Sequence, residues 1–594
     1  MIPAIATIFV VALTVILGAA GTRHARTTSN FFVASRAVNP VWNAFAVCGE
    51  AMSAASYLGV PALILVFGVD MLWTLVGWTI GFLLLSLFIA APVRRFGSYT
   101  IPEFIVGRLD APGLRPIVAA AVIVSSWFFL LAQLKGAGVI TRELVGAPYW
   151  VGVVAVGVLV AANLSAGGMR GITFVQGFQF FFIFLGILVP FMVLGAKWVE
   201  GDLPPLITPD TPSFLVETVV EYPNEITFNL LEAATVVGDG VVDGAVVDGS
   251  LDLAEGRHLI GAGTELLWSE GTLAPFEEGI EPLTGEEWAA PLGDKDLGGG
   301  HTLYFSYASL LANMLGLIAL PHIVVRFYTN PTGREARRTN LWVLALIAPY
   351  YAMLPLLGSA GRIFAPGLIG NGNTDSATVV LGERIADGLT GELVGAIVSA
   401  GAAAAFLSTA SGLLIAMAGA LSHDILGAGV PQFRFAVWVG AAVSVAAGIA
   451  VEGIDINVLI GWSTAIAASS IGPLLVLGIW WTGFTKRGAM ATVLVGGTAT
   501  TIAVGLTLFG VIEAGWPRAI MSTPAAWSVP LAFGVGAVVS VLDPDKVADI
   551  GHKFALMHLP ERVVSTGSDD PDDPEQPAAV GVGRKSEGFG RLGA

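Results

Sequence analysis

Gly49-Glu50-Ala51-Met52-Ser53-Ala54-Ala55-Ser56-Tyr57-Leu58-Gly59 is the stretch that decides the fold of this 594-residue chain. It lies inside an apolar run from about Val41 to Val69, yet it is rich in small and hydroxyl residues and carries one carboxylate. A helix that only met lipid would consist of Leu, Ile and Val. Small residues let backbones approach closely, and Gly and Ser allow a helix to break within the bilayer, which frees carbonyls to hold an ion or solute. The stretch therefore points to membrane transport.

The composition extends this interpretation to the whole chain. Hydrophobic residues make up 55% and charged residues 12% of the sequence, which is more apolar than an average soluble domain. A bilayer core is crossed by roughly 20 apolar residues per helix. The sequence therefore predicts an all-α integral membrane protein with about 13 transmembrane helices, at 3–21, 42–69, 72–92, 116–138, 149–168, 172–198, 303–328, 341–361, 391–420, 435–451, 456–483, 488–511 and 525–542.

The charge is concentrated in one hydrophilic segment. Residues 201–300 contain 20 acidic and 2 basic residues, whereas the rest of the chain is nearly balanced. The Val-Gly-Asp repeats at 236–244 are typical of short strands and turns, or of a mobile loop. The segment is interpreted either as acidic decoration or as a lid or vestibule that concentrates cations. The predicted organisation is helices 1–6 in 1–199, an acidic extracytoplasmic insert at 200–302, helices 7–13 in 303–545, and a disordered cytoplasmic tail at 546–594.

Basic residues indicate the orientation in the membrane. The chain starts without a basic region, and Arg23 and Arg26 follow the first apolar run, which favours an uncleaved helix with its N-terminus outside. Most other loop arginines then fall on the inner side, as the positive-inside rule requires. We expect a multi-pass protein of the bacterial plasma membrane with a cytoplasmic C-terminus.

A second informative stretch is Ala402 to Ser411, in which the hydroxyl residues Ser408 and Thr409 are adjacent in mid-membrane. Two hydroxyl oxygens with a few freed carbonyls would supply about five hard oxygen ligands, a set that suits Na⁺ by the oxygen-ligand logic known for Ca²⁺. The alternative is structural, because a Ser or Thr in a membrane helix commonly bonds its own i−4 carbonyl or packs helices.

Two intramembrane charges are candidates for the substrate pathway. Glu50 and Lys135 both lie in apolar surroundings, where charges are costly and indicate function. Lys135 is also about a turn from the predicted outer end of its helix, so its amine can instead reach the interface. We hypothesise either a Lys135–Glu50 pair or capture of an anionic substrate by Lys135. Gln133, two residues away, faces another side of the helix.

Several further features narrow the function. Pro321 is predicted to kink its helix, and the adjacent His322 is interpreted as a polar packing residue or a proton relay. The single cysteine, Cys48, excludes an intrachain disulfide and a cysteine metal cluster. No ATP-binding or hydrolase signature stands out, so an enzyme or an ATP-driven pump lacks support.

Taken together, these stretches resemble the solute:sodium symporter family, and within it the cation/acetate (monocarboxylate) branch. The resemblance covers roughly residues 1–545 except the insert. The matching segments are Met52–Gly59, Arg95–Phe104, Ala132–Gln133 with Gly136–Gly138, Gly167–Gly171, Leu320–Tyr328, Leu407–Ser411 and Ser422–Asp424.

The resemblance implies a LeuT-like transporter with two inverted five-helix repeats, helices 2–6 and 7–11, and a broken helix 2. It implies Na⁺ as the coupling ion, held by carbonyls of Gly49, Met52 and Ala405 and by the hydroxyls of Ser408 and Thr409. The substrate would be a small carboxylate near the midplane. The resemblance also implies that Ser53 lies next to the cation site, and we expect the pathway candidates to be Glu50, Ser53, Ser56, Gln133 and Lys135.

Two departures leave the substrate and the coupling open. Ala51 stands where several members carry an acidic residue, with Glu50 before it, and Lys135 replaces an expected apolar residue. The expected function is Na⁺-coupled uptake of a monocarboxylate such as acetate by alternating access, with the lipid bilayer as surroundings and no nucleic-acid partner. Alternatives are another small solute (proline, a sugar, pantothenate or a haloacid), proton coupling through Glu50 or His322, or a transporter-like sensor, which the short tail disfavours. The sequence does not fix the oligomeric state.

Overall fold

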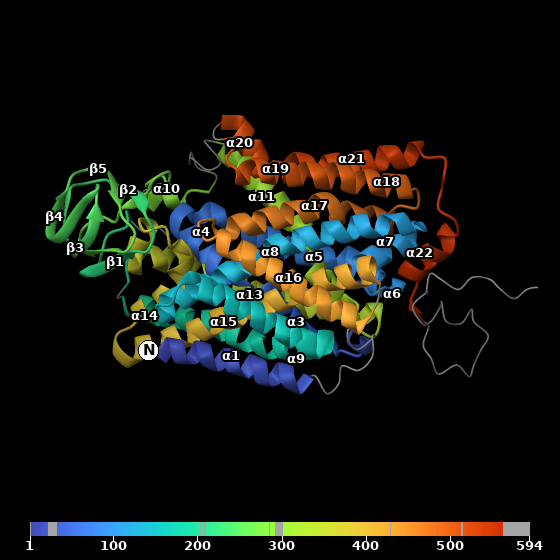
Figure 1. The fold of residues 1–594 in the computed structure, drawn as a ribbon, viewed down its shortest axis with the longest axis horizontal. Coiled ribbons are helices and arrows are strands. Elements are labelled where there is room, and N and C mark those ends of the chain that lie inside the picture. The colour runs from blue at the N-terminus through green and yellow to red at the C-terminus, as the bar shows by residue number, and fades with distance from the viewer. Residues whose placement is uncertain are drawn as a thin grey trace, which may run out of the picture.

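The computed structural model describes residues 2–21, 33–201, 203–206, 210–283, 285–291, 301–427, 429–512 and 515–561. A bundle of long helices carries a small β-domain at one end (Figure 1). Ten helical segments in these described ranges are long and apolar enough to cross a membrane. The chain is thus a multi-pass, mostly helical membrane protein, but the prediction of an all-α protein is wrong because the insert forms a β-sheet. The exact count of 13 spans and the inverted repeat stay predictions.

The N-terminal part of the bundle ends where the acidic insert begins. Its α-helices are α1 (Ile2–Gly21), α3 (Pro40–Ala51), α4 (Val60–Phe67), α5 (Leu72–Leu84), α6 (Ala90–Phe96), α7 (Ile101–Leu109), α8 (Arg115–Val145) and α9 (Tyr149–Glu200). Shorter 3-10 or π turns link them: η2 (Ala34–Arg36), η3 (Ala55–Gly59), η4 (Gly68–Met71), η5 (Leu85–Ile89) and η6 (Pro112–Leu114).

The C-terminal part of the bundle follows the insert. Its α-helices are α11 (Thr302–Leu317), α12 (Pro321–Phe327), α13 (Gly333–Phe364), α14 (Ala377–Arg384), α15 (Gly388–Gly419), α16 (Val430–Ala450), α17 (Ile456–Trp480), α18 (Lys486–Ala491), α19 (Thr498–Leu508), α20 (Gly515–Ser522), α21 (Ala525–Leu542) and α22 (Ile550–His558). The turns here are η7 (Pro366–Ile369), η8 (Thr374–Ser376), η9 (Ala420–Leu426) and η10 (Thr492–Gly497).

Two helices break in mid-bundle. The run predicted at 42–69 stops being helical at Met52 and Ser53, between α3 and η3. The run predicted at 303–328 stops after Leu317 and restarts at Pro321, where Leu320 has extended backbone angles. Pro321 cannot donate a backbone hydrogen bond, which explains the second break. Both breaks were predicted from small residues and from proline.

A third irregularity divides α9. Its 52 residues are far longer than a bilayer span needs, and Gly168 inside it has φ +55° and ψ −160°. Such backbone angles favour glycine, which has no Cβ to clash. The two segments predicted at 149–168 and 172–198 thus lie on either side of this bend.

The acidic insert folds into a seven-stranded sheet with antiparallel pairing. The strands are β1 (Thr218–Tyr222), β2 (Ile226–Leu230), β3 (Ala234–Val242), β4 (Ala245–Leu253), β5 (Gly256–Ile260), β6 (Thr264–Trp268) and β7 (Phe276–Glu277). Their order is β1-β6-β3-β5-β2-β7, with β4 paired to β3. Asp243 and Gly244 both have positive φ between β3 and β4, as a two-residue type I′ hairpin requires. The Val-Gly-Asp repeats therefore form strands rather than a loop without structure.

The insert sits on the end of the broken helix. Trp288, from the insert helix α10 (Gly285–Ala289), is 1% exposed and donates from Nε1 to the Leu65 carbonyl at the end of α4, 3.2 Å away. Arg362 of α13 donates to three carbonyls, those of Leu65, Asp210 and Leu283, and lies 5.6 Å from the Trp288 ring. The insert is therefore fastened to the ends of α4 and α13.

The predicted disordered tail is partly ordered. Helix α22 occupies residues 550–558, so the prediction of disorder is wrong for this part. The reason is packing: Met557 is fully buried, and Arg95 of α6 donates to the carbonyls of Met557 and His558. Residues 562–594 lie outside the described residues.

The two ends of the bundle differ in what they carry. Helix α1 begins at the end that bears the β-strands, and α22 lies at the opposite end (Figure 1). This arrangement agrees with the predicted placement of the N-terminus and the insert on one side and the tail on the other. Which side is the cytoplasm stays a prediction from the arginine pattern.

Candidate cation and substrate sites

The predicted cation ligands come from two helices that meet beside the first break. Ser408 and Thr409 of α15 are fully buried, as are Met52 and Ala405. A Cβ added to Gly49 would lie 3.4 Å from Ser408 Oγ, so this hydroxyl faces the end of α3. Thr409 Oγ1 donates to the Glu50 carbonyl at 2.6 Å. The fold therefore brings the hydroxyl pair against the broken helix.

Ser408 Oγ has no hydrogen-bond partner within the part of the chain that the structure describes, although it is buried. A buried polar atom left unpaired is unusual and costs free energy. A hard cation between Ser408 and Gly49 would satisfy it. The donor set, hydroxyls and carbonyls, is the oxygen set that Na⁺ accepts. The residues present therefore fit the predicted ion.

The break itself is stabilised by side chains. In a continuous helix the Ala54 amide would bond the Glu50 carbonyl, but here it donates to Gln133 Oε1 at 3.0 Å. The Ala55 amide donates to Ser53 Oγ. Gln133, a predicted pathway residue, thus caps the second half of the broken helix and leaves the Glu50 carbonyl to Thr409.

Glu50 pairs with a residue that the sequence analysis did not select. Its Oε2 accepts from Nε of Arg326 in α12 at 2.5 Å, and both side chains are fully buried. The hypothesis of a Lys135–Glu50 pair is therefore wrong. Arg326 lies in the apolar segment 317–328, so its isolated charge was the signal that would have found it.

Lys135 lies toward the end of the bundle that carries the insert. Its Nζ is 2.9 Å from Asp375 Oδ2 in η8 and donates to the Ile454 carbonyl at 2.7 Å. Asp375 also accepts from the Ile456 amide at the start of α17. The position agrees with the alternative in which the amine leaves the middle of the membrane. Burial raises the pKa of nearby Glu277 in β7, as does the charge of Asp455, while Lys135 lowers it.

A small cavity lies between the two helix breaks. Its wall contains Ala51, Ser53, Trp78, Phe129, Leu317, Leu320, His322, Ile323, Tyr351, Ile460 and Thr464. About 20 Å³ is open to the centre of a water-sized molecule, enough for roughly one water. His322 is 1% exposed, and its Nδ1 has no partner within the described ranges. Of the five pathway candidates, Ser53 belongs to this wall.

Ser56 has a packing role near the same cavity. Its Oγ donates to the Ser53 carbonyl at 3.2 Å and lies 3.3 Å from the Tyr350 hydroxyl. These contacts tie the π-helical turn η3 to α13. Among the predicted pathway residues, Ser56 and Gln133 thus hold the broken helix in shape, whereas Ser53 faces the cavity.

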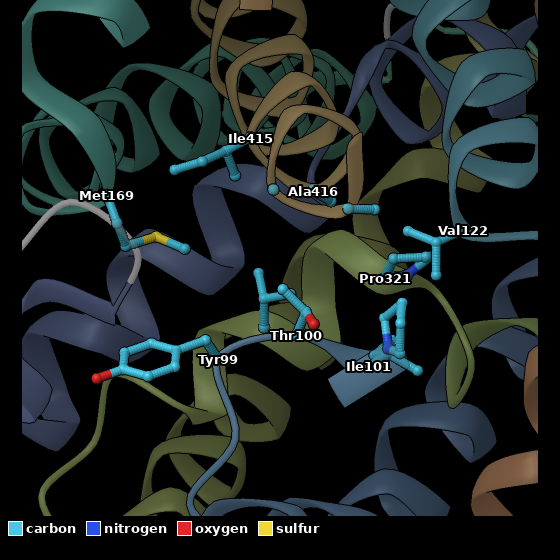
Figure 2. A pocket seen from close by; sticks show the side chains of 12 residues that line it. Tyr99, Thr100, Ile101, Val122, Met169, Pro321, Ile415 and Ala416 are labelled. Atoms are coloured by element: carbon cyan, nitrogen blue, oxygen red, sulfur yellow. The ribbon is translucent and has the colours of Figure 1, made fainter. Parts of the chain in front are cut away.

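A second cavity lies on another side of α12. Figure 2 shows Tyr99, Thr100 and Ile101 gathered opposite Ile415 and Ala416 of α15, with Met169 and Pro321 at its sides. His322 and Ile323 line the first cavity, and Pro321 and Val325 line the second. The short helix α12 thus separates two cavities, an arrangement suited to a solute pathway with a barrier between its halves.

Comparisons with known proteins identify the family of the chain. A sequence model described as the sodium:solute symporter family matches residues 31–197 and 302–496, on both sides of the insert. The uncharacterized symporter YwcA of Bacillus subtilis is 27% identical over 557 residues, covering 91% of this chain and 94% of that protein. The monocarboxylic acid transporter of Corynebacterium glutamicum is 26% identical over 580 residues, covering 93% of each chain.

The fold also resembles a solved structure. A Na⁺-coupled sialic acid symporter, in a substrate-bound outward-open state, aligns with a TM-score of 0.59 at 14% identity. The alignment covers 92% of this chain and 99% of that one. At this identity the likeness concerns the fold alone.

Proposed function

We propose that this chain, which belongs to the sodium:solute symporter family, takes up a small monocarboxylate such as acetate together with Na⁺ by alternating access. Family membership makes it a secondary transporter of a small solute rather than an enzyme. The proposed coupling ion is Na⁺, with Gly49, Met52, Ala405, Ser408 and Thr409 as its ligands. The observation that carries the proposal is the unpaired, buried Ser408 hydroxyl facing the end of α3.

The monocarboxylate has its own support. The similar Corynebacterium protein is a monocarboxylic acid transporter, and the cavity between the two breaks is small. Its wall offers the hydroxyl of Ser53 and the unpaired Nδ1 of His322. In the neutral tautomer that carries its proton on Nδ1, the His322 ring would donate to a carboxylate oxygen. We place the substrate at this cavity, beside the cation site. Because the cavity has room for roughly one water here, its walls must move apart to admit acetate.

The coupling follows from the shared broken helix. The proposed cation site takes the carbonyls of Gly49 and Met52 at the end of α3. The cavity wall begins at Ala51 and Ser53, the residues on either side of Met52. A cation that orders this backbone favours one conformation and with it the substrate site, because a ligand shifts an equilibrium by its differential affinity for the two states. We also propose two inverted repeats, each beginning with a broken helix, and a bacterial plasma membrane with the insert outside.

Radiolabelled acetate uptake into proteoliposomes tests the proposal. The parent is compared with Ser408→Ala/Thr409→Ala, with and without an inward Na⁺ gradient. Loss of charge-assisted ligands should reduce Na⁺-driven uptake about tenfold or more. Ser411→Ala is the matched control, because Ser411 Oγ donates back to the Leu407 carbonyl on the same helix, and it should retain uptake.

Three results would contradict parts of the proposal. Parent uptake that ignores Na⁺ but follows a proton gradient would overturn Na⁺ coupling. Na⁺ binding without acetate uptake would overturn the substrate. Equal loss in Ser411→Ala would show that the double variant only perturbs packing, and would remove the argument for the ligands.

A further inference from the structure

Arg326 of α12 connects its own helix to α3 and α9 beside the proposed cation site. Besides pairing with Glu50 of α3, its Nη1 donates to Thr173 Oγ1 at 2.9 Å and to Met169 Sδ at 3.2 Å, both in α9. Its Nη2 donates to Gln176 Oε1. Each guanidinium nitrogen therefore has a partner, and the planar group holds α3, α9 and α12 in one arrangement.

The contacts continue to the proposed ligands and close into a ring. Gln176 Nε2 donates to the Ser408 carbonyl at 2.8 Å. The next residue, Thr409, donates to the Glu50 carbonyl, and the Glu50 side chain pairs with Arg326. Each proposed hydroxyl ligand is thus connected to Arg326, Ser408 through Gln176 and Thr409 through Glu50.

The same helix reaches the proposed substrate. His322 and Arg326 are one turn apart on α12, and residues i and i+4 lie on one face of a helix. His322 lines the cavity, while Arg326 holds the ring. A displacement of α12 at His322 therefore moves the guanidinium as well.

We propose that Glu50, Arg326 and Gln176 are positioning residues that couple the substrate cavity to the cation site through α12. This inference rests on the proposed function of both sites. In the intact ring, a substrate that fixes α12 also fixes Ser408 and Thr409, so each ligand raises the affinity for the other. Such coupling is reciprocal. The ring itself needs no direct contact between substrate and Na⁺.

Two variants perturb the ring without removing its charges. Gln176→Leu cuts the connection to Ser408. Gly412→Ala acts on Glu50, because a Cβ at Gly412 would lie 1.5 Å from Glu50 Oε1. Gly419→Ala on the same helix is the matched control, since a Cβ there meets nothing within 4 Å.

The measurement is Na⁺ affinity, read from the Na⁺-dependent rise in melting temperature of purified protein, with and without saturating acetate. We expect acetate to tighten Na⁺ binding in the parent and in Gly419→Ala by about 5- to 150-fold, the usual range of coupling. In Gln176→Leu and Gly412→Ala this factor should fall toward one. A merely structural role would lower the melting temperature but leave the factor unchanged.

The outcomes separate two kinds of failure. A parent that binds no Na⁺, or whose Na⁺ affinity ignores acetate, would overturn the proposed function and the coupling with it. A parent with coupling that persists undiminished in Gln176→Leu would overturn this inference alone. Should Gly412→Ala fail to fold, Gln176→Leu still decides, because it leaves the Glu50–Arg326 pair intact.

Discussion

Two buried ion pairs occupy opposite situations in this molecule. Glu50–Arg326 lies inside the bundle, where both side chains are fully buried and side chains supply the other contacts of the guanidinium. Lys135–Asp375, here called the outer pair, lies toward the insert, where the backbones of Ile454 and Ile456 complete its contacts. The inner pair connects helices that surround the proposed sites, whereas the outer pair fastens α8 to two loop segments.

An isolated charge in an apolar segment therefore predicts that a charged partner exists, but it does not predict the function of the pair. Glu50 and Lys135 gave the same signal in the sequence. The role depends on the element that supplies the partner: a helix between two cavities for Glu50, and the η8 turn for Lys135. Burying either pair costs desolvation, so neither is explained by stability alone.

The largest effect should distinguish the two pairs directly. Arg326→Met leaves the Glu50 carboxyl group buried without its cation, which should lower the free energy of unfolding by about 3–5 kcal/mol. Lys135→Met should cost roughly half as much, because Asp375 keeps the hydrogen bond from the Ile456 amide. Chemical unfolding of the purified variants measures this. Equal losses would show that the two pairs are equivalent.

A smaller effect should come from the junction between the insert and the bundle. Trp288→Ala removes a buried ring that contacts Arg362 and bonds the Leu65 carbonyl, at a cost of about 3 kcal/mol. We expect proteases to cleave faster at the chain segments that join the insert to the bundle. We also expect the Lys135–Asp375 pair, which is nearer the insert, to be weakened before the Glu50–Arg326 pair. Val246→Ala is the control, since Val246 is 84% exposed. Unchanged cleavage would mean that other contacts hold the insert.

The smallest effect concerns pH and the insert alone. Burial raises the pKa of Asp243, but hydrogen bonds from His258 and the Leu259 amide outweigh it, so its pKa is lowered. A lowered carboxyl pKa stabilises the fold above the unfolded-state value, and this stability is lost as the pH falls through the folded-state value. Because the side chain is half exposed, the contribution is below about 1 kcal/mol.

Amide exchange of β3 and β4, corrected for its intrinsic pH dependence, measures this effect. We expect acid to accelerate exchange in the parent and less so in Asp243→Asn. A parent and variant with the same acid response would assign the acid sensitivity to another carboxyl group.

Much of the fold could be predicted from the sequence because membrane segments and their breaks are local signals. The apolar runs, the small residues before Tyr57 and the proline at 321 each act on neighbouring backbone. The meeting of Ser408 and Thr409 with Gly49 came from the family resemblance, and the structure brings these residues together. The ligand set itself stays a proposal.

The partners of the charges could not be predicted, because they depend on which helices become neighbours. Asp375 and Arg326 are each more than 200 residues away from the charges they neutralise. The fold of the insert could not be predicted for a similar reason. Some of its strands pair with strands that are not their neighbours in the chain, as β1 does with β6. The helix α22 was missed because tertiary contacts stabilise it: Met557 is buried, and Arg95 of α6 donates to the Met557 carbonyl.

The close approach of Gly412 to Glu50 has an evolutionary consequence. A glycine at 412 costs nothing while Glu50 fills the space beside it, but any larger residue there collides with the carboxylate. The two positions are therefore epistatic, and the order of substitutions matters. If residue 50 is first replaced by a smaller residue, residue 412 can then become larger. A return to glutamate at position 50 would afterwards bring its carboxylate into collision with residue 412.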